Sequence, residues 1–329
     1  MIARRAALAF SLSTGTARAQ NTGGTATPAI VPRWPEKPVK LVIPFGAGGP
    51  IDGVGRLLAE LLRERLGQPF VIDNRPGAGG SLGIRAVVQS PPDGSAFVLT
   101  SSSLASIPAL YPSAGLDPRS AMTPVSLVAD VPTALVVNAA SELNDVPTLL
   151  RIARAQPGKL TYGSGGVGSS NHLSGALFAH VAGVDLTHVS YRGAAPAMTA
   201  LYAGEIDMVF ASTVETLPHV RAGRARLLGV TSAGRVPALP DVPAVAEWVP
   251  GYVALNWYAI AGPLGLAPEI ATRFATTLAS LRDLPDVKAR FAAAGTEPML
   301  ATPAALRQRL DEEVPQWQRV VAAAGIKVE

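Results

Sequence analysis

The sequence predicts an α/β fold with two lobes, each built around a mostly parallel sheet. Short apolar runs such as residues 39–43 alternate with segments whose apolar residues recur every three or four positions, the pattern of strands followed by helices. Two longer extended segments, residues 125–137 and 252–260, flank the second series of alternations. We therefore expect the chain to cross into a second lobe and return, leaving a two-strand hinge with the ligand cleft between the lobes.

The extended segments set the expected domain boundaries. We expect one lobe to comprise residues 34–132 and 255–329, and the other to comprise residues 133–254. Residues 1–19 contain an adjacent pair of arginines near their start, followed by a short apolar run and an Ala-Arg-Ala end, which is typical of a secretory signal peptide. Residues 20–33, rich in Thr, Gly, Ala and Pro, predict a disordered lead-in. A twin-arginine export route and a cytosolic N-terminus remain as alternatives.

Composition argues against several classes of protein. The chain has 329 residues, 48% of them hydrophobic, and a formal net charge of +4. Three of its 28 basic residues lie in residues 1–19, so the remainder has 25 basic and 24 acidic residues and no basic stripe for nucleic acid. No later apolar run is long enough to insert into a membrane. With zero cysteines, disulfides, thiol catalysis and thiolate metal sites are excluded.

The first strand is followed by a glycine-rich loop, residues 44–52, which leads into a helix. Glycines let the backbone turn sharply, and the first N–H groups of a helix lack partners within it, so such a junction attracts anions. The alternative is that the glycines only turn the chain. Asp52 has two interpretations as well: it contacts a ligand amine or a bound water, or it caps its helix, which is the favoured one.

A second glycine-rich loop, residues 162–172, follows the first strand of the second lobe and also opens a helix. It carries no acidic or basic side chain apart from His172, and it adds hydroxyl groups. Ser169 or Ser170 is expected to cap the helix or to bond a ligand oxygen. Two such helix starts in opposite lobes can together hold a carboxylate ligand.

Two enzyme motifs compete with this interpretation. Gly163, Gly165 and Gly168 match the dinucleotide fingerprint, but the expected acid, Asp185, precedes the next strand instead of ending it. Residues 79–83 match the G-x-S-x-G elbow of Ser hydrolases, but that turn must follow its strand directly, and Ser81 as a helix cap is the alternative. No lysine follows either glycine run as in a phosphate-binding loop.

The four histidines are too scattered to predict a metal site, and no cofactor is expected. His172, in the first turn of a helix, is expected to orient the second loop, whereas His188 within a strand is expected to be a core residue. Arg192 follows the strand that contains His188 and is the one cation well placed to attract an acid, unless it forms only a surface ion pair.

Many motifs in one order resemble the Bug-type, TctC-like extracytoplasmic solute receptors of tripartite tricarboxylate transporters. They span the chain from Trp34 to its C-terminus and comprise Pro44-Phe45 with Gly48-Gly49 and Asp52; Asn74 with residues 77–80 and Gly83; Pro92-Asp93-Gly94; Tyr162-Gly163-Ser164 with Gly168-Ser169 and His172; His188-Val189 with Tyr191-Arg192-Gly193 and Pro196-Ala197; and residues 239–243. Ala47 and Ser190 depart from the pattern, because many members have proline at these positions.

The resemblance implies a type II-like periplasmic binding protein that binds a small mono-, di- or tricarboxylate or an aromatic acid without catalysis. It implies a monomer in the periplasm that docks transiently to a membrane transporter. A ligand sensor for a membrane signalling partner is the alternative, and a hydrolase or dinucleotide-dependent enzyme a more distant one. The expected ligand-binding residues are Phe45, Gly46, Ala47, Gly48, Gly49, Asp52, Gly79, Gly80, Ser102, Ser164, Gly166, Val167, Gly168, Ser169, His172, Arg192, Asp207 and Ser212.

Overall fold

The structure is a computed structural model that describes residues 34–236 and 239–328. The predicted signal peptide, residues 1–19, and the lead-in, residues 20–33, lie outside the described residues. Within the described ranges, no helix combines the length and the apolar character needed to cross a membrane.

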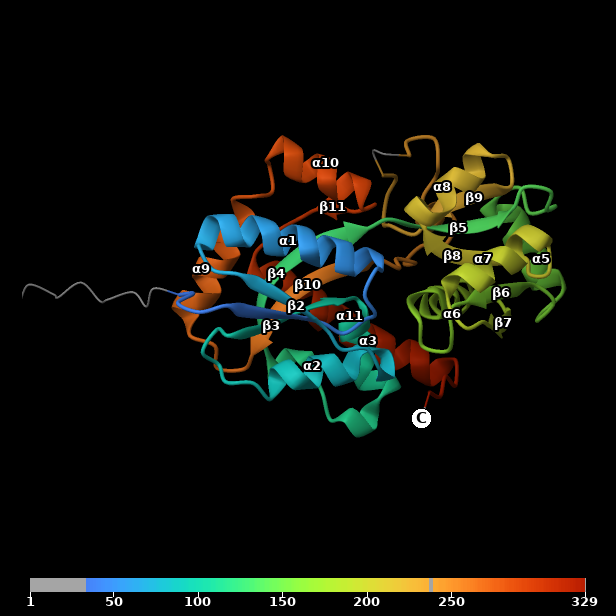
Figure 1. Ribbon diagram of the computed structural model, residues 1–329. Coiled ribbons are helices and arrows are strands. Elements are labelled where there is room, and N and C mark those ends of the chain that lie inside the picture. The colour runs from blue at the N-terminus through green and yellow to red at the C-terminus, as the bar shows by residue number, and fades with distance from the viewer. Residues whose placement is uncertain (1–33, 237–238, 329) are drawn as a thin grey trace, which may run out of the picture. The chain divides into compact units, whose positions relative to one another are not determined.

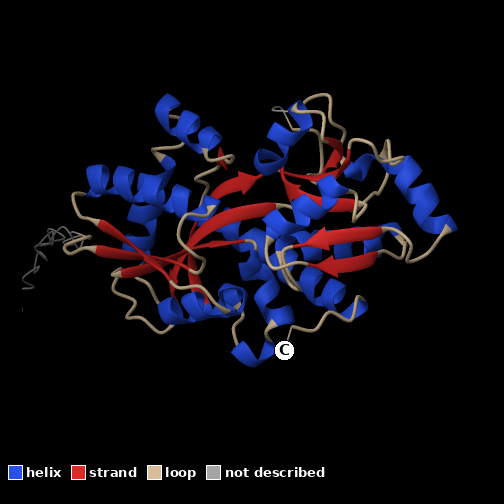
Figure 2. Ribbon diagram, turned by 45° about the vertical axis from the view of Figure 1, so that its right-hand side comes forward, coloured by secondary structure: helices blue, strands red, loops and turns tan. Residues whose placement is uncertain are grey.

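The described chain forms two sheets (Figures 1 and 2). The first has the order β11-β4-β10-β3-β1-β2, with β1, β2 and β3 parallel and β10 antiparallel to both of its neighbours. Its strands are β1 (Val39–Ile43), β2 (Phe70–Asn74), β3 (Ala96–Ser101), β4 (Met122–Val131), β10 (Asn256–Pro263) and β11 (Glu297–Pro298). The second has the order β7-β6-β8-β5-β9, with β5 antiparallel to both of its neighbours. Its strands are β5 (Thr133–Asn138), β6 (Thr161–Ser164), β7 (Thr187–Ser190), β8 (Met208–Ser212) and β9 (Ala225–Val230).

Helices cover both faces of each sheet. Six of them begin with a proline in the first turn, where its missing N–H costs nothing. The helices are α1 (Pro50–Leu66), α2 (Ser81–Val88), α3 (Ser103–Leu110), α4 (Pro118–Ala121), α5 (Val146–Ala155), α6 (Ser170–Ala182), α7 (Ala194–Ala203), α8 (Thr213–Arg221), α9 (Pro268–Ala279), α10 (Pro285–Ala293) and α11 (Pro303–Ala323). In Figure 1, α1, α9 and α10 lie on one side of the first sheet, and α2, α3 and α11 on the other.

The chain passes between the sheets at two places. Only Pro132 separates β4 from β5, and the return leads through Ala254 into β10. The Thr133 and Thr231 hydroxyls hydrogen-bond each other, and each also bonds the Ala254 carbonyl, at 3.2 and 2.7 Å. The two crossings are therefore tied together. This confirms the predicted pair of α/β lobes, while the lobe boundaries at 132/133 and 254/255 stay a prediction.

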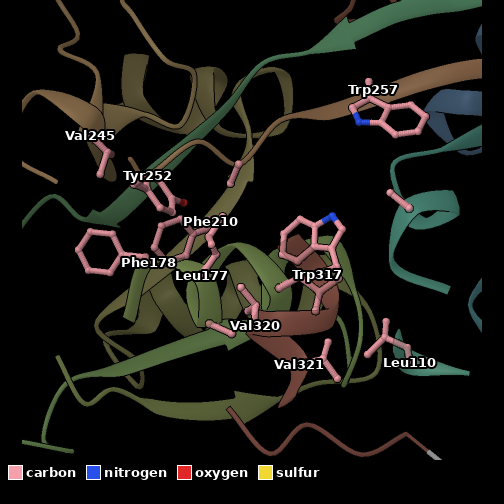
Figure 3. Close-up of a cluster of buried hydrophobic side chains, with 14 of the residues drawn as sticks. Leu110, Leu177, Phe178, Phe210, Val245, Tyr252, Trp257, Trp317, Val320 and Val321 are labelled. Carbon is pink, nitrogen blue, oxygen red and sulfur yellow. The ribbon is translucent and has the colours of Figure 1, made fainter. Parts of the chain in front are cut away.

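One hydrophobic core cluster runs through both sheets. It includes Trp257 from β10, Phe178 from α6 and Phe210 from β8. Figure 3 shows that α11 contributes Trp317, Val320 and Val321 to it, close to the α6 side chains. The C-terminal helix thus packs against strands of the first sheet and against a helix of the second.

The predicted bounds of two strands were wrong. The single long strand predicted for residues 125–137 is two strands, because Pro132 lacks the N–H that a continuous ladder needs. Residues 252–255, predicted to be extended, precede β10 as a loop, and β10 continues to Pro263 instead. The helix α3 after Ser102 was not predicted.

Candidate functional site

The first glycine loop is held by a buried carboxylate. Asp52, the third residue of α1, is 2% exposed and accepts the N–H of Gly48 at 2.9 Å. The Asn74 side-chain amide, at the end of β2, donates to Asp52 at 3.0 Å and to the Phe45 carbonyl at 3.1 Å. Loop, helix and neighbouring strand are thereby joined. Asn74 was not among the predicted site residues, although its place after a parallel strand could have suggested it.

Asp52 is ionised in this arrangement. Burial alone would raise the pKa of its carboxyl, but the hydrogen bonds from Gly48, Arg56 and Asn74 outweigh burial and lower it. The favoured interpretation of Asp52 as a helix cap was wrong. The N-cap residue of α1 is Gly49, which makes no side-chain hydrogen bond, and the Asp52 carboxylate instead accepts the N–H of Gly48 in the loop. Direct contact of Asp52 with a ligand stays a prediction.

The second loop is built by the same rule. Gly168 has φ +79° where Gly48 has φ +85°, a left-handed conformation that favours glycine. Its N–H donates at 3.0 Å to Nδ1 of His172, which is the third residue of α6 as Asp52 is of α1. In each loop, a buried side chain four residues on therefore holds the N–H of a left-handed glycine.

Each loop leaves one equivalent N–H group unused. The residues before these glycines, Ala47 and Val167, are both exposed. In the part of the chain that the structure describes, their N–H groups donate no hydrogen bond. The Gly48 and Gly168 N–H groups, in contrast, are already bonded within the protein. Ala47 and Val167 are thus an equivalent pair among the loop donors available to an anion.

Two hydroxyl groups of the second loop, those of Ser164 and Ser169, are hydrogen-bonded within it. Ser164 is fully buried, and its Oγ accepts the Gly166 N–H at 3.1 Å and lies 2.7 Å from Nε2 of His188. Ser169 is the N-cap of α6, as predicted, and its Oγ accepts the His172 N–H at 3.4 Å. These hydroxyls shape the loop, and their contact with a ligand stays a prediction.

A pair of stacked histidines lies behind the second loop. The ring centroids of His172 and His188 are 3.9 Å apart. Burial, with a smaller contribution from the charge of His188, lowers the pKa of His172 to about 4, and burial lowers that of His188. Both rings are therefore neutral at pH 7, and His172 keeps the lone pair that accepts the Gly168 N–H. His172 orients the loop, as expected from its position.

A second glycine turn supports the first loop. Gly79 and Gly80, before α2, have φ of +62° and +98°. A Cβ at Gly80 would lie 3.4 Å from Cβ of Pro44, so this turn packs directly beneath the first loop. Ser81 is the first residue of α2 after a short 3-10 turn and makes no capping hydrogen bond. It is therefore neither the directly strand-linked serine of a hydrolase elbow nor the helix cap suggested as the alternative.

The other predicted site residues are more dispersed. Ser102 is buried and donates to Oδ1 of Asn256 at 2.9 Å, beside the crossing. Arg192 is exposed and has no hydrogen bond or ion pair with any described residue. Ser212 ends β8 and is half-buried. Asp207 accepts the N–H and Oγ1 of Thr161 at 2.7 and 2.9 Å, at the opposite end of β6 from Ser164, so the structure does not bring it to the second loop.

Two apolar side chains approach the second loop from the first lobe. A Cβ at Gly168 would lie 3.2 Å from a methyl of Leu110, in α3, and 3.2 Å from a methyl of Val328, after α11. No sequence signal points to either residue, because their contact with Gly168 depends on how the lobes pack.

The two tied lobes and their matched glycine loops are the architecture of a solute-binding protein. The chain belongs to the tripartite tricarboxylate transporter family receptors (TctC), whose family pattern matches residues 54–326. It is 35% identical over 310 residues to Protein BugT of Bordetella pertussis, covering 93% of this chain and 95% of BugT. Members of the family and the structural neighbours are solute-binding receptors, not enzymes.

Solved structures agree with this assignment. The chain is similar to R. palustris Rpa4515 with adipate, with a TM-score of 0.77, 35% sequence identity, and coverage of 89% of this chain and 99% of that one. It is also similar to MatC from Rhodopseudomonas palustris with bound malate, with a TM-score of 0.74, 29% identity, and coverage of 88% and 100%.

Proposed function

We propose that the protein is a periplasmic receptor that binds a small organic acid, most favourably a dicarboxylate, and delivers it to a membrane transporter. The observation that carries the proposal is the matched pair of unused N–H groups, at Ala47 and Val167, each in the loop before the N-terminus of a long helix. Such a terminus stabilises an anion by about 0.3 to 1 kcal/mol when exposed, and by up to about 2 kcal/mol when partly buried.

Each loop is proposed to take one carboxylate. Neither loop contains a lysine or arginine, so selectivity comes from hydrogen-bond geometry, and Arg192 steers acids toward the second loop from its exposed position. The adipate and malate in the names of two structural neighbours are dicarboxylates, which supports this ligand class. We also propose that the predicted signal peptide exports the protein and that the protein docks to a membrane transporter. Membership of the receptor family supports both proposals.

A thermal-shift panel tests the ligand class. Protein freed of ligand by unfolding and refolding, and checked by native mass spectrometry, is mixed with adipate, malate, succinate, citrate and benzoate, each beside its uncharged methyl ester. An acid at 100 times its dissociation constant adds about 2.7 kcal/mol of stability. We expect this gain with at least one diacid and none with its ester. Equal shifts with acid and ester, or no shift with any acid, would refute the proposal.

Gly168→Ala is expected to weaken binding more than it weakens the fold. The added methyl strains a backbone with φ +79°, at a cost of about 1 to 2 kcal/mol, and crowds Leu110 and Val328. The Val167 N–H of the shifted loop then no longer points at the ligand carboxylate. We expect the affinity for the acid found in the panel to fall at least tenfold, as measured by isothermal titration calorimetry.

Gly183→Ala is the matched control for this prediction. It lies just after the other end of α6, has φ +62° and has open space for a methyl group. It should cost similar stability without changing affinity. If both variants bind as tightly as the wild type, the second loop does not contact the ligand.

A further inference from the structure

A pocket of about 400 Å³ lies behind the second loop, within the size range of small-molecule sites. Its walls come from α6, the α6–β7 connection, β6, β7 and the end of α11. The lining residues include Tyr162, His172, Ala179, Asp185, His188 and Ala323. His172 and His188 also hold the second loop through Gly168 and Ser164. These two rings are thus a wall shared by the pocket and the loop.

The pocket is lined by two largely buried residues, Tyr162 and His172, that each offer a polar atom without a partner in the described part of the chain. Tyr162 is 4% exposed, and its hydroxyl makes no hydrogen bond to any described residue. His172 is 5% exposed and uses only Nδ1, as an acceptor from Gly168. Since its ring is neutral, the proton is on Nε2, and this N–H has no partner among the residues that the structure describes. Both groups belong to residues that line the pocket, so their polar atoms can bond an acceptor oxygen of an occupant.

The charges around the pocket argue against an anion as occupant. Asp185 is exposed at its edge, and α6 and α11 both end there, at Ala182 and Ala323, with the partial negative charge of a helix C-terminus. The remaining titratable group, His180, is exposed. Alanine methyl groups from α6 and α11 leave room for a flat apolar body beside the rings.

We propose that this pocket binds a small uncharged aromatic molecule whose hydroxyl or carbonyl oxygen accepts the Nε2 proton of His172 and bonds the Tyr162 hydroxyl. The site is separate from the organic-acid site and does not depend on it. Its occupancy restrains the same two rings that hold the second loop.

Phenol is the probe, titrated into the full chain and followed by the imidazole nitrogen signals of His172 and His188 in NMR. We expect saturable binding, with a dissociation constant below about 10 mM, and a shift of the His172 Nε2 signal. Benzoate, of similar shape but anionic, should displace bound phenol at least tenfold less effectively than unlabelled phenol does. Absence of saturable phenol binding, or displacement by benzoate as effective as by phenol, would overturn the proposal.

Two variants fill the pocket from opposite walls. Ala179→Phe acts from α6, and Ala323→Phe acts from the exposed end of α11, where a folding defect is least expected. Each should weaken phenol binding at least tenfold. Ala292→Phe, exposed on α10 in the first lobe, is the matched control and should bind phenol like the wild type. Unchanged binding in both pocket variants would place phenol elsewhere and refute the site.

Discussion

Replacing Asp52 by alanine is expected to abolish organic-acid binding, with at least a hundredfold loss of affinity, and to cost about 3 kcal/mol of stability. The carboxylate is buried and accepts hydrogen bonds from Gly48, Asn74 and Arg56. Without it, the Gly48 N–H and the Asn74 amide lose their partner. A hydrogen bond to a charged group contributes about 1.5 to 3 kcal/mol, and several such bonds to the Asp52 carboxylate are lost together. Calorimetric titration gives the affinity and urea unfolding the stability.

Arg56→Gln separates loop bracing from ion pairing. The Arg56 side chain is 58% exposed although that of Asp52 is only 3% exposed, so solvent screens the pair from the arginine side, and we expect it to contribute about 1 kcal/mol or less. We expect this variant to lose under about 1 kcal/mol of stability and to bind with nearly full affinity. If Arg56→Gln lost as much affinity and stability as Asp52→Ala, the important contact of Asp52 would be its ion pair with Arg56. Its hydrogen bond with the Gly48 N–H would then not be what holds the loop.

Glu313→Gln is expected to stabilise the protein above neutral pH. Glu313, on α11, is largely buried and accepts the Trp257 indole N–H at 2.9 Å, and Arg309 lies 3.7 Å away. Burial raises the pKa of its carboxyl to about 7, despite the opposing effects of Arg309 and the indole. Arg309 is shared with Asp130, 3.8 Å away, whose pKa burial also raises. One buried cation thus faces two carboxylates beside the strand crossing.

The pH dependence follows from the raised pKa. The folded protein binds the Glu313 proton more tightly than the unfolded chain, so the wild type loses stability as pH rises from about 4.5 to about 7. A difference of about 2.5 pKa units corresponds to about 3 kcal/mol. Glu313→Gln should therefore match the wild type near pH 4 and exceed its stability by up to about 3 kcal/mol at pH 8.

Urea unfolding at a series of pH values measures this difference. His172, with its lowered pKa, has the opposite effect, destabilising the fold as pH falls from about 6.5 to about 4. Because both proteins contain His172, its effect cancels in their difference. Glu312→Gln, exposed on the same helix, is the control and should follow the wild-type profile. Parallel profiles for Glu313→Gln and wild type would show that Glu313 is not protonated near neutrality.

Local patterns in the sequence were sufficient for the α/β alternation and for both glycine loops. A strand, a glycine turn and a helix start are specified by neighbouring residues, through apolar period, φ and capping, so they can be read from a short window. The four-residue spacing from Gly48 to Asp52 recurs between Gly168 and His172. All four of these residues were among the predicted site residues. The motifs also identified the receptor family, since many of them occur in one order.

The partners of those residues could not be read from the sequence, because they depend on strand order and lobe packing. Asp52 can accept a hydrogen bond from Asn74 because β1 and β2 are neighbours in the first sheet. His188 can reach Ser164 because β6 and β7 are neighbours in the second sheet. Ser102 and Asn256 meet across 154 residues of chain. A pattern of period 2 or 3.6 states which face of an element is buried, but not which element covers it. The folded chain alone therefore places α11 on both lobes and Val328 beside Gly168.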